Sequence, residues 1–243
     1  MSVITEQVST SIEALMDEFY IITHNLANVS TVGFKRRCNA FSRVLEGQES
    51  TEEYSPGSIN LESAFDFSQG GMVETGRELD FALFGRGFFV IETAAGPLYT
   101  RNGTFRTNQN GQIVDGEGRI VSGEAGPITI PANVSLSQLS VSSNGSIRVG
   151  DTAIGRFRIV DFGENESKLV PVGASCFLMP EEGIVPVAAE DVVVKQGYQE
   201  SSNVRIVDEL VDMIMVCRLY EANMKFITAQ EETSNSIMGV AMG

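Results

Sequence analysis

Residues 8–29 of the chain read VSTSIEALMDEFYIITHNLANV. The large apolar residues of this stretch recur at alternating steps of four and three positions, a spacing that places side chains on one face of a helix. We therefore predict an amphipathic helix near the N-terminus. Its apolar face is expected to consist of Val8, Ile12, Leu15, Phe19, Ile22, Leu26 and Val29.

The C-terminal part of the chain shows the same alternation. The side-chain oxygens of Ser201, Ser202 and Asn203 can cap free backbone amides, so a second helix is expected to begin there. The first helix is expected to end between Asn28 and Gly33, where turn-forming residues precede a glycine that can adopt positive φ. The apolar face of the second helix is expected to consist of Ile206, Leu210, Met213, Cys217, Tyr220, Met224 and Ile227.

A helix with one apolar face needs a partner that covers it, and isolated helices of this size are marginal in water. We expect the two terminal helices to pair with each other as a coiled coil. Each buried Leu, Ile or Phe of such a pair would contribute about 1.5–3 kcal/mol. The alternative is that both helices lie on the central domain, as in many α+β proteins.

Between the helices the pattern changes to short runs of β-branched and aromatic residues separated by turn residues. Asn102-Gly103, Asn110-Gly111 and Asn144-Gly145 are dipeptides typical of hairpin turns, which require positive φ. These features predict an antiparallel β-rich domain. The runs that indicate strands are Phe88 to Thr93, Leu98 to Arg101, Gln112 to Val114, Arg119 to Val121 and Ile154 to Val160.

The predicted fold is therefore α+β, with the terminal helices paired and a central antiparallel β-rich domain. The polar stretch between the first helix and the β-rich domain has only scattered apolar residues, and we interpret it as an extended arm. The predicted divisions are an N-terminal helix at 1–35, the arm at 36–70, the β-rich domain at 71–195 and a C-terminal helix at 196–243.

The composition excludes several classes of function. A formal net charge of −15 repels phosphate backbones and anionic lipid, which argues against nucleic-acid binding. No apolar run approaches the roughly 18–20 residues of a spanning helix, so we expect no membrane insertion. The N-terminus lacks the basic-then-apolar layout of a cleaved signal peptide, which indicates a cytosolic protein or one exported without such a signal.

The sequence offers little for catalysis, cofactor binding or metal binding. The single histidine, His24, lies off the apolar face of the first helix, and no nucleophile motif accompanies it. The segment Gly85-Arg86-Gly87 lacks the third glycine and the following helix of a phosphate-binding loop. The three cysteines are far apart, so they are expected to be buried thiols rather than metal ligands. We expect no catalytic, cofactor or metal site.

The sequence between Asn25 and Arg36, NLANVSTVGFKR, closely resembles the N-terminal signature of flagellar rod and hook axial proteins. The sequence from Gly197 to Val204, GYQESSNV, is similar to the matching C-terminal signature of that family. In the middle, residues 79–90 and 99–105 resemble the start of the family's β domain. Within the family, the modest length and single compact β region look most like the proximal-rod members, with the distal-rod members second.

Two departures from the family pattern concern the helices. Family members often carry Gly-Met and further small residues in the first helix, whereas this chain has Ile12 to Asp17 there. Gln199 replaces a more typical apolar residue. Because of these two departures, the resemblance does not fix how the helices pack or which position in the rod the chain occupies.

The resemblance implies a structural subunit of the flagellar basal-body rod, a part of the axial drive shaft that crosses the periplasm. Its implied partners are other copies of itself, neighbouring rod proteins, the flagellar export apparatus and the surrounding ring proteins. The alternative is a β-sandwich ligand-binding or adhesin-like module flanked by helices. The expected assembly interface consists of Val8, Ile12, Leu15, Phe19, Ile22, Leu26, Asn25, Asn28, Thr31, Gly33, Phe34, Lys35, Asn203, Ile206, Leu210, Met213, Ile214, Cys217, Tyr220, Glu221, Asn223, Met224 and Ile227.

Overall fold

The computed structural model describes residues 3–39, 63–181 and 183–242. The described residues form two compact units. The helical unit contains residues 3–27, 37–39, 63–64 and 204–242, and the β unit contains residues 28–36 and most of 65–203. Much of the predicted arm, residues 40–62, lies outside the described residues.

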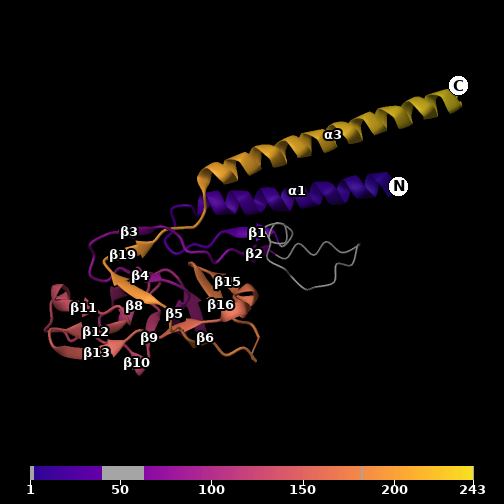
Figure 1. Ribbon diagram of the computed structural model, residues 1–243. Coiled ribbons are helices and arrows are strands. Elements are labelled where there is room, and N and C mark those ends of the chain that lie inside the picture. Colours follow the sequence, from indigo (N-terminus) through magenta and orange to yellow (C-terminus); the bar gives the residue numbers. More distant parts are fainter. Residues whose placement is uncertain (1–2, 40–62, 182, 243) are drawn as a thin grey trace. The chain divides into compact units, whose positions relative to one another are not determined.

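The helical unit contains the two terminal helices, α1 (Val3–Ala27) and α3 (Ile206–Met242), which lie side by side (Figure 1). Helix α1 ends where the Thr31 amide bonds the Asn28 carbonyl and Gly33 adopts a φ of 66°. Two short strands, β1 (Arg37–Asn39) and β2 (Ser63–Phe65), form a separate two-stranded sheet. A helix at each terminus agrees with the prediction.

The predicted coiled coil is wrong. Ile22 is buried, but most of the C-terminal residues assigned to the paired face are exposed to solvent. The sides of the helices that meet combine buried Ile22 and Val216 with polar groups: Asn25 bonds the Glu209 carboxylate at 3.2 and 3.3 Å, and Asn223 bonds Ser11 Oγ at 3.2 Å. The exposed positions of the predicted face are Phe19, Ile206, Leu210, Cys217, Tyr220 and Met224.

The physical reason lies in how the apolar residues of α3 are distributed. With about 3.6 residues per turn, the exposed residues from Ile206 to Phe226 cover more than half of the helix circumference, not one stripe. Several different apolar stripes can therefore be drawn through these residues, and the spacing in the sequence does not show which one faces α1. The α+β class still agrees with the structure, because the chain contains two terminal helices and, between them in the sequence, a large antiparallel β region.

The largest sheet of the β unit is antiparallel and has the order β15-β16-β6-β5-β9-β8-β7. Strand β10 pairs with β9, and β14 joins β5 to β17. These strands are β5 (Phe88–Thr93), β6 (Gly96–Thr100), β7 (Arg106–Thr107), β8 (Ile113–Val114), β9 (Ile120–Gly123), β10 (Gly126–Pro127), β14 (Ile159–Asp161), β15 (Val170–Gly173), β16 (Cys176–Leu178) and β17 (Val187–Ala188).

Smaller antiparallel sheets complete the β unit. One is a meander in the order β11-β12-β13, and two others pair β18 with β4 and β19 with β3. Their strands are β3 (Met72–Glu74), β4 (Phe81–Phe84), β11 (Leu139–Val141), β12 (Ser146–Val149), β13 (Thr152–Arg156), β18 (Val193–Gln196) and β19 (Tyr198–Glu200). Two 3₁₀ helices lie at Leu136–Gln138 and Gly163–Lys168.

Strand β5 lies between two hydrophobic clusters because its side chains alternate between the faces of the sheet. Phe89 and Ile91 belong to one cluster, which also contains Phe81, Phe105 and Phe157. Phe88 and Val90 belong to the other cluster, together with Phe162 and Phe177. Both faces of this strand are therefore covered by the described core.

Two of the three predicted Asn-Gly turns connect neighbouring strands. Gly111 lies between β7 and β8 and Gly145 between β11 and β12, both with positive φ. Asn102-Gly103 is different. A Cβ on Gly103 would lie 1.9 Å from the Phe81 carbonyl oxygen, so this glycine is needed for close packing of the backbone.

Candidate assembly site

The segment that follows α1 is fixed within the β unit by the turn at Gly33. The Gly33 amide donates to the Glu200 carbonyl at 2.8 Å. A Cβ at Gly33 would lie 2.4 Å from the Asn102 backbone nitrogen, and the φ of 66° disfavours other residues as well. Gly33 therefore allows residues 28–36 to pack directly on the loop after β6.

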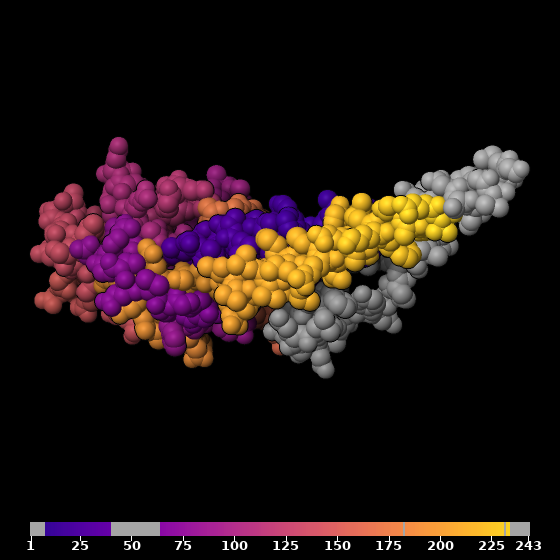
Figure 2. Space-filling model, turned by 90° about the horizontal axis from the view of Figure 1, so that it is seen from above, coloured from indigo at the N-terminus to yellow at the C-terminus, as the bar shows by residue number. Residues whose placement is uncertain are grey.

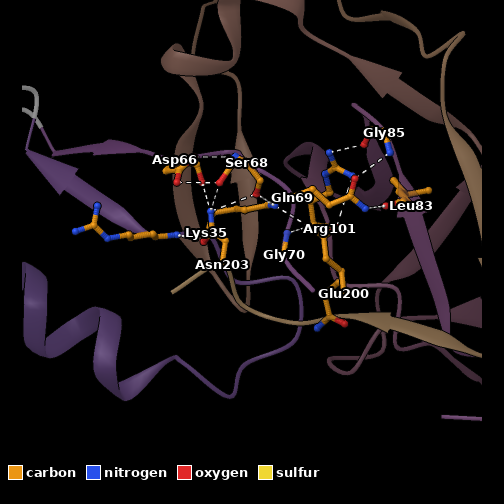
Figure 3. Close-up of polar contacts among 12 residues, drawn as sticks. Lys35, Asp66, Ser68, Gln69, Gly70, Leu83, Gly85, Arg101, Glu200 and Asn203 are labelled. Atoms are coloured by element: carbon orange, nitrogen blue, oxygen red, sulfur yellow. Dashed lines mark hydrogen bonds and ion pairs between the residues drawn. The ribbon is translucent and has the colours of Figure 1, made fainter. Parts of the chain in front are cut away.

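A buried group of charges joins this segment to β19 (Figure 3). Lys35 Nζ donates to Glu200 Oε1 at 2.7 Å and to the Ser68 carbonyl at 2.7 Å. The Gly70 amide donates to the same carboxylate oxygen at 3.0 Å. On the other side, Arg101 Nη1 lies 3.6 Å from Glu200 Oε2. The side chains of Lys35 and Glu200 have no exposed surface.

Burial dominates the electrostatics of this group, which we call the Glu200 cluster (Lys35, Arg101 and Glu200). Loss of solvent lowers the pKa of Lys35, nearby Arg101 lowers it further, and Glu200 opposes the shift. Burial also lowers the pKa of Arg101, again against the attraction of Glu200. Glu200 thus faces two buried cations. Asp66 also favours the charged form of Lys35, and Glu166 and Asp161 that of Arg101, so removal of Glu200 takes away the strongest attraction of each cation but not the only one.

Asn203 makes a second connection between the terminal segments, three residues beyond Glu200. Its Oδ1 accepts the Arg36 amide at 2.7 Å, and its Nδ2 donates to the Asp66 carbonyl at 2.8 Å and to the Ser68 carbonyl at 3.2 Å. The segment that leaves α1 and the segment that enters α3 are therefore bonded to the same part of the β unit.

Gln199, on the same strand as Glu200, is held by a buried aspartate. Asp80 Oδ2 accepts hydrogen bonds from Gln199 Nε2 at 2.8 Å and from Thr75 Oγ1 at 2.7 Å. The Gly197 amide donates to the Asp80 carbonyl at 2.8 Å. The residue that departs from the family pattern thus has a specific polar partner in this chain.

The helical unit presents the second feature of the site, an exposed apolar surface on α3. Figure 2 shows α3 at the surface beside α1. Val207 is 70% exposed and Met215 57% exposed, values typical of surface positions rather than of a helix core. We call this surface the α3 face. It consists of Ile206, Val207, Leu210, Val211, Ile214, Met215, Leu219, Tyr220, Met224 and Phe226.

The structure divides the predicted interface residues into three groups. Some are buried in their own unit: Ile22, Asn25, Gly33, Phe34 and Lys35. Others are half-buried: Val8, Ile12, Leu15, Leu26, Asn28, Thr31, Asn203, Met213, Asn223 and Ile227. The remainder are exposed: Phe19, Ile206, Leu210, Ile214, Cys217, Tyr220, Glu221 and Met224.

The interface predicted from the sequence omits residues of both the Glu200 cluster and the α3 face. Glu200, Arg101 and Asp80 were not singled out, although a charged residue inside a strand-forming segment is a signal for a buried partner. Val207, Val211, Met215 and Leu219 were missed because the prediction assigned α3 a single stripe.

Other kinds of site receive no support from the part of the chain that the structure describes. No group of three or more His, Cys, Asp or Glu side chains there is arranged to hold a metal ion. Among the described helices, none is long and apolar enough to cross a membrane.

Comparison with known proteins gives one match within the β unit and one that covers the end of the β unit and most of α3. Residues 82–149 match the family model described as flagellar hook protein FlgE/F/G D1 domain. Residues 195–240 match the model described as flagellar basal body rod FlgEFG protein C-terminal.

Curated relatives match over most of their length. The chain is 32% identical to the flagellar basal-body rod protein FlgG of Agrobacterium fabrum, covering 94% of this chain and 95% of the relative. It is 34% identical to FlgF of Mesorhizobium japonicum, covering 82% and 81% respectively. It is 32% identical to FlgF of Salmonella typhimurium, covering 87% of each.

Proposed function

Because the chain belongs to the FlgF/FlgG family of flagellar basal-body rod proteins, we propose that the α3 face is the surface through which it enters the rod. The chain is a structural subunit of the bacterial flagellar basal-body rod. Its family is structural and not a class of enzymes. None of these relatives favours the alternative of a β-sandwich ligand-binding module.

The observation that carries this proposal is the width of the α3 face. Ten large apolar residues are exposed along one helix, and contiguous apolar surface of this kind marks an interaction site. Burying them stabilises a complex by about 25 cal/mol for each square ångström removed from water. Neighbouring subunits that cover the face would supply this term when the subunit is incorporated.

In this proposal the buried residues of the predicted interface do not contact neighbouring subunits themselves but support assembly indirectly. Lys35, Gly33 and Asn203 hold the segments that lead into the two helices, as the hydrogen bonds to Glu200 and Arg36 indicate. The exposed residues Phe19, Leu210 and Ile214 make the contacts themselves.

The family places the chain in the basal body, in assembly with other rod proteins. More specifically, the subunit contacts other copies of itself and neighbouring rod proteins in the part of the rod that crosses the periplasm. It reaches that place through the flagellar export apparatus without a cleaved signal peptide, and ring proteins surround the finished rod. These finer assignments rest on the family resemblance.

The substitution Ile214→Asp tests the proposal. Ile214 is 55% exposed, so the change leaves the unfolding temperature of the isolated subunit nearly unaltered. In the rod the same change buries an unpaired charge, which costs several kcal/mol. We expect a folded subunit that is absent from purified basal bodies, measured by quantitative immunoblotting and by swimming in soft agar.

Val187→Asp is the matched control, because Val187 is also a β-branched apolar residue that is exposed, and it lies on the edge strand β17. The control is expected to assemble at the level of the unmodified chain. Normal incorporation of Ile214→Asp would show that the α3 face is not an assembly surface.

A further inference from the structure

Strand β3 of the β unit pairs with β19 on one side only (Figure 1). Two backbone bonds fix the phase of this ladder: the Ser201 amide donates to the Gly71 carbonyl and the Thr75 amide to the Gly197 carbonyl, each at 2.8 Å. In an antiparallel ladder, bonded pairs alternate with non-bonded pairs, so the backbone groups of residues 71, 73 and 75 face β19. The backbone groups of the residues between them point away from β19.

Those outward groups are the amides and carbonyls of Met72 and Glu74. Among the described residues, no hydrogen bond occupies them. A Cβ on Gly71 or on Gly76 would have no described atom within 4 Å, so the space at both ends of the strand is open. Val73 between them is 51% exposed. We call Met72, Val73 and Glu74 the β3 edge.

Several other edges of the β unit carry features that keep a further strand from pairing. Proline has no amide hydrogen, and it occurs at Pro127 in β10, at Pro171 in β15 and at Pro186 just before β17. The second side of β4 is capped by Gln69, whose side-chain amide bonds the backbone there at 3.0 and 3.1 Å. In the described part of the chain, the β3 edge has neither proline nor such a cap.

The β3 edge is complementary to itself. When two β3 strands lie antiparallel and centred on Val73, Met72 of each copy is opposite Glu74 of the other. These are the residues with outward backbone groups, so each such pair exchanges two hydrogen bonds. The two Val73 residues form the non-bonded pair at the centre, where opposite side chains approach most closely.

Charge and hydrogen bonding also select this register over its neighbours. A shift of two positions in one direction sets the Glu74 carboxylates of the two copies directly opposite each other, which is destabilising. A shift in the other direction sets Glu74 opposite Gly70, whose amide already donates to Glu200 at 3.0 Å. Only the register centred on Val73 avoids both.

We propose that two free subunits pair antiparallel through the β3 edge, with Val73 opposite Val73 of the second copy and Met72 opposite Glu74. The contact is two-fold, so it closes on a dimer and adds no further copies. It is therefore distinct from the α3 face, which the proposed function assigns to the rod, and it concerns the subunit before incorporation. Pairing covers a strand edge that otherwise templates aggregation.

Disulfide trapping in the full chain tests the pairing. The exposed Cys217 is first replaced by serine, and Val73→Cys is added. Opposite residues of a non-bonded pair have Cα atoms about 4.5 Å apart, within the range that a disulfide spans. Under mild copper–phenanthroline oxidation we expect a product near twice the chain's 26.3 kDa. The matched control is Asp151→Cys, also exposed on the β unit, which is expected to give at least about tenfold less product.

The register gives a sharper comparison. Met72→Cys alone and Glu74→Cys alone are expected to cross-link poorly, because equivalent residues on either side of the centre lie beyond the roughly 7 Å limit of a disulfide. An equimolar mixture of the two chains is expected to cross-link well. The inference is overturned if Val73→Cys gives no more product than Asp151→Cys, or if the mixture gives no more than either chain alone.

Proline at the β3 edge provides a second measurement. Met72→Pro or Glu74→Pro removes an outward amide and leaves the bonds to β19 in place, so either is expected to lower cross-linking of the Val73→Cys chain by about tenfold. Unchanged cross-linking in folded variants, verified by circular dichroism, would contradict the pairing. If neither variant folds, the cysteine comparison decides.

The inference and the proposed function fail separately. Ile214→Asp in the Val73→Cys chain is expected to leave the cross-linked fraction within about twofold. If Ile214→Asp abolishes the product, the dimer depends on the α3 face and the inference is wrong. If the product forms but Ile214→Asp enters basal bodies normally, the β3 pairing stands and the proposed function is wrong.

Discussion

At the residue level, the Glu200 cluster shows how two ends of a chain can depend on one carboxylate. Glu200 accepts from Lys35 and from the Gly70 amide, and it faces Arg101. Burying three charged groups is costly, and the cluster is stable only while their mutual attraction and hydrogen bonds offset that cost. The cluster therefore contributes more to the choice of partner segments than to net stability.

Glu200→Gln is expected to destabilise the folded chain more than Lys35→Met does. The first change takes the nearest carboxylate away from two buried cations, whereas the second leaves Arg101 and Glu200 together. Removing one partner of a buried pair costs about 3–5 kcal/mol, and we expect Glu200→Gln at or above the upper end of that range. Urea unfolding followed by circular dichroism measures both.

The double variant Lys35→Met with Glu200→Gln completes the cycle. Because the two residues are in contact, its loss of stability is expected to be smaller than the combined loss of the single variants. Strict additivity would show that the two groups do not interact in solution.

His24 gives the helical unit a predictable response to pH. Partial burial of the ring lowers its pKa below the ordinary value, and the Arg37 guanidinium lowers it further. As pH falls below the ordinary histidine value, the unfolded chain takes up a proton before the folded chain does. The stability associated with neutral His24 is thus present above that value and is lost as pH falls through the lowered pKa.

Since His24 is the only histidine, its ring protons give one NMR titration that needs no assignment. We expect a midpoint below the ordinary value of about 6.5, and an unfolding free energy that decreases as the pH falls below that value. His24→Gln should reduce that dependence. A midpoint at or above the ordinary value would contradict the expected burial.

At the level of elements, Asn25 determines how α1 connects to the strand that follows. The Arg37 amide donates to Asn25 Oδ1 at 2.9 Å, and Asn25 Nδ2 donates to the Arg37 carbonyl at 2.8 Å. Asn25→Ala removes these two bonds and the bonds to the Glu209 carboxylate from a fully buried site, at about 1–3 kcal/mol for each buried group left unsatisfied. Urea unfolding of the variant measures the loss.

Asn223→Ala is the matched control for this prediction. Asn223 also bonds α1, but its bond to Ser11 is exposed and is replaced by water when lost. We expect a change of less than about 0.5 kcal/mol. Equal effects of the two substitutions would show that the hydrogen bonds of Asn25 to Arg37 and Glu209 do not stabilise the helical unit.

The same elements show what the sequence can predict and why the rest was missed. Strand β5 coincides with its predicted run, because consecutive aromatic and β-branched residues need cover on both faces. Residues 154–160 were predicted as one strand but form β13 and β14. The break occurs because the Phe157 amide bonds Gly145 and the Arg158 amide bonds Ser122, so the backbone changes partners there.

Long-range partners account for the remaining differences. Lys35 and Glu200 are 165 positions apart, and no local pattern indicates that they meet. On α3, apolar residues on several sides satisfy the spacing of one stripe, so periodicity alone could not identify the side that faces α1. The predicted coiled coil was wrong for this reason, although both terminal helices were predicted.

At the level of the whole molecule, the division into two units predicts what survives when α3 is removed. Neither hydrophobic cluster of the β unit contains a described residue of α3. The ion pair between Lys35 and Glu200 also lies entirely before Leu210 in the sequence. A chain that stops at Glu209 should therefore keep the core around Phe89 and Phe88 and unfold cooperatively. It loses nearly the whole α3 face, so we expect it to be absent from basal bodies and the cells to be non-motile. Far-ultraviolet circular dichroism during heating measures the first outcome, and immunoblotting of basal bodies with soft-agar swimming measures the second. If the truncated chain shows no cooperative transition, the β unit depends on α3 for its own fold; if the cells swim normally, the face is not required for assembly.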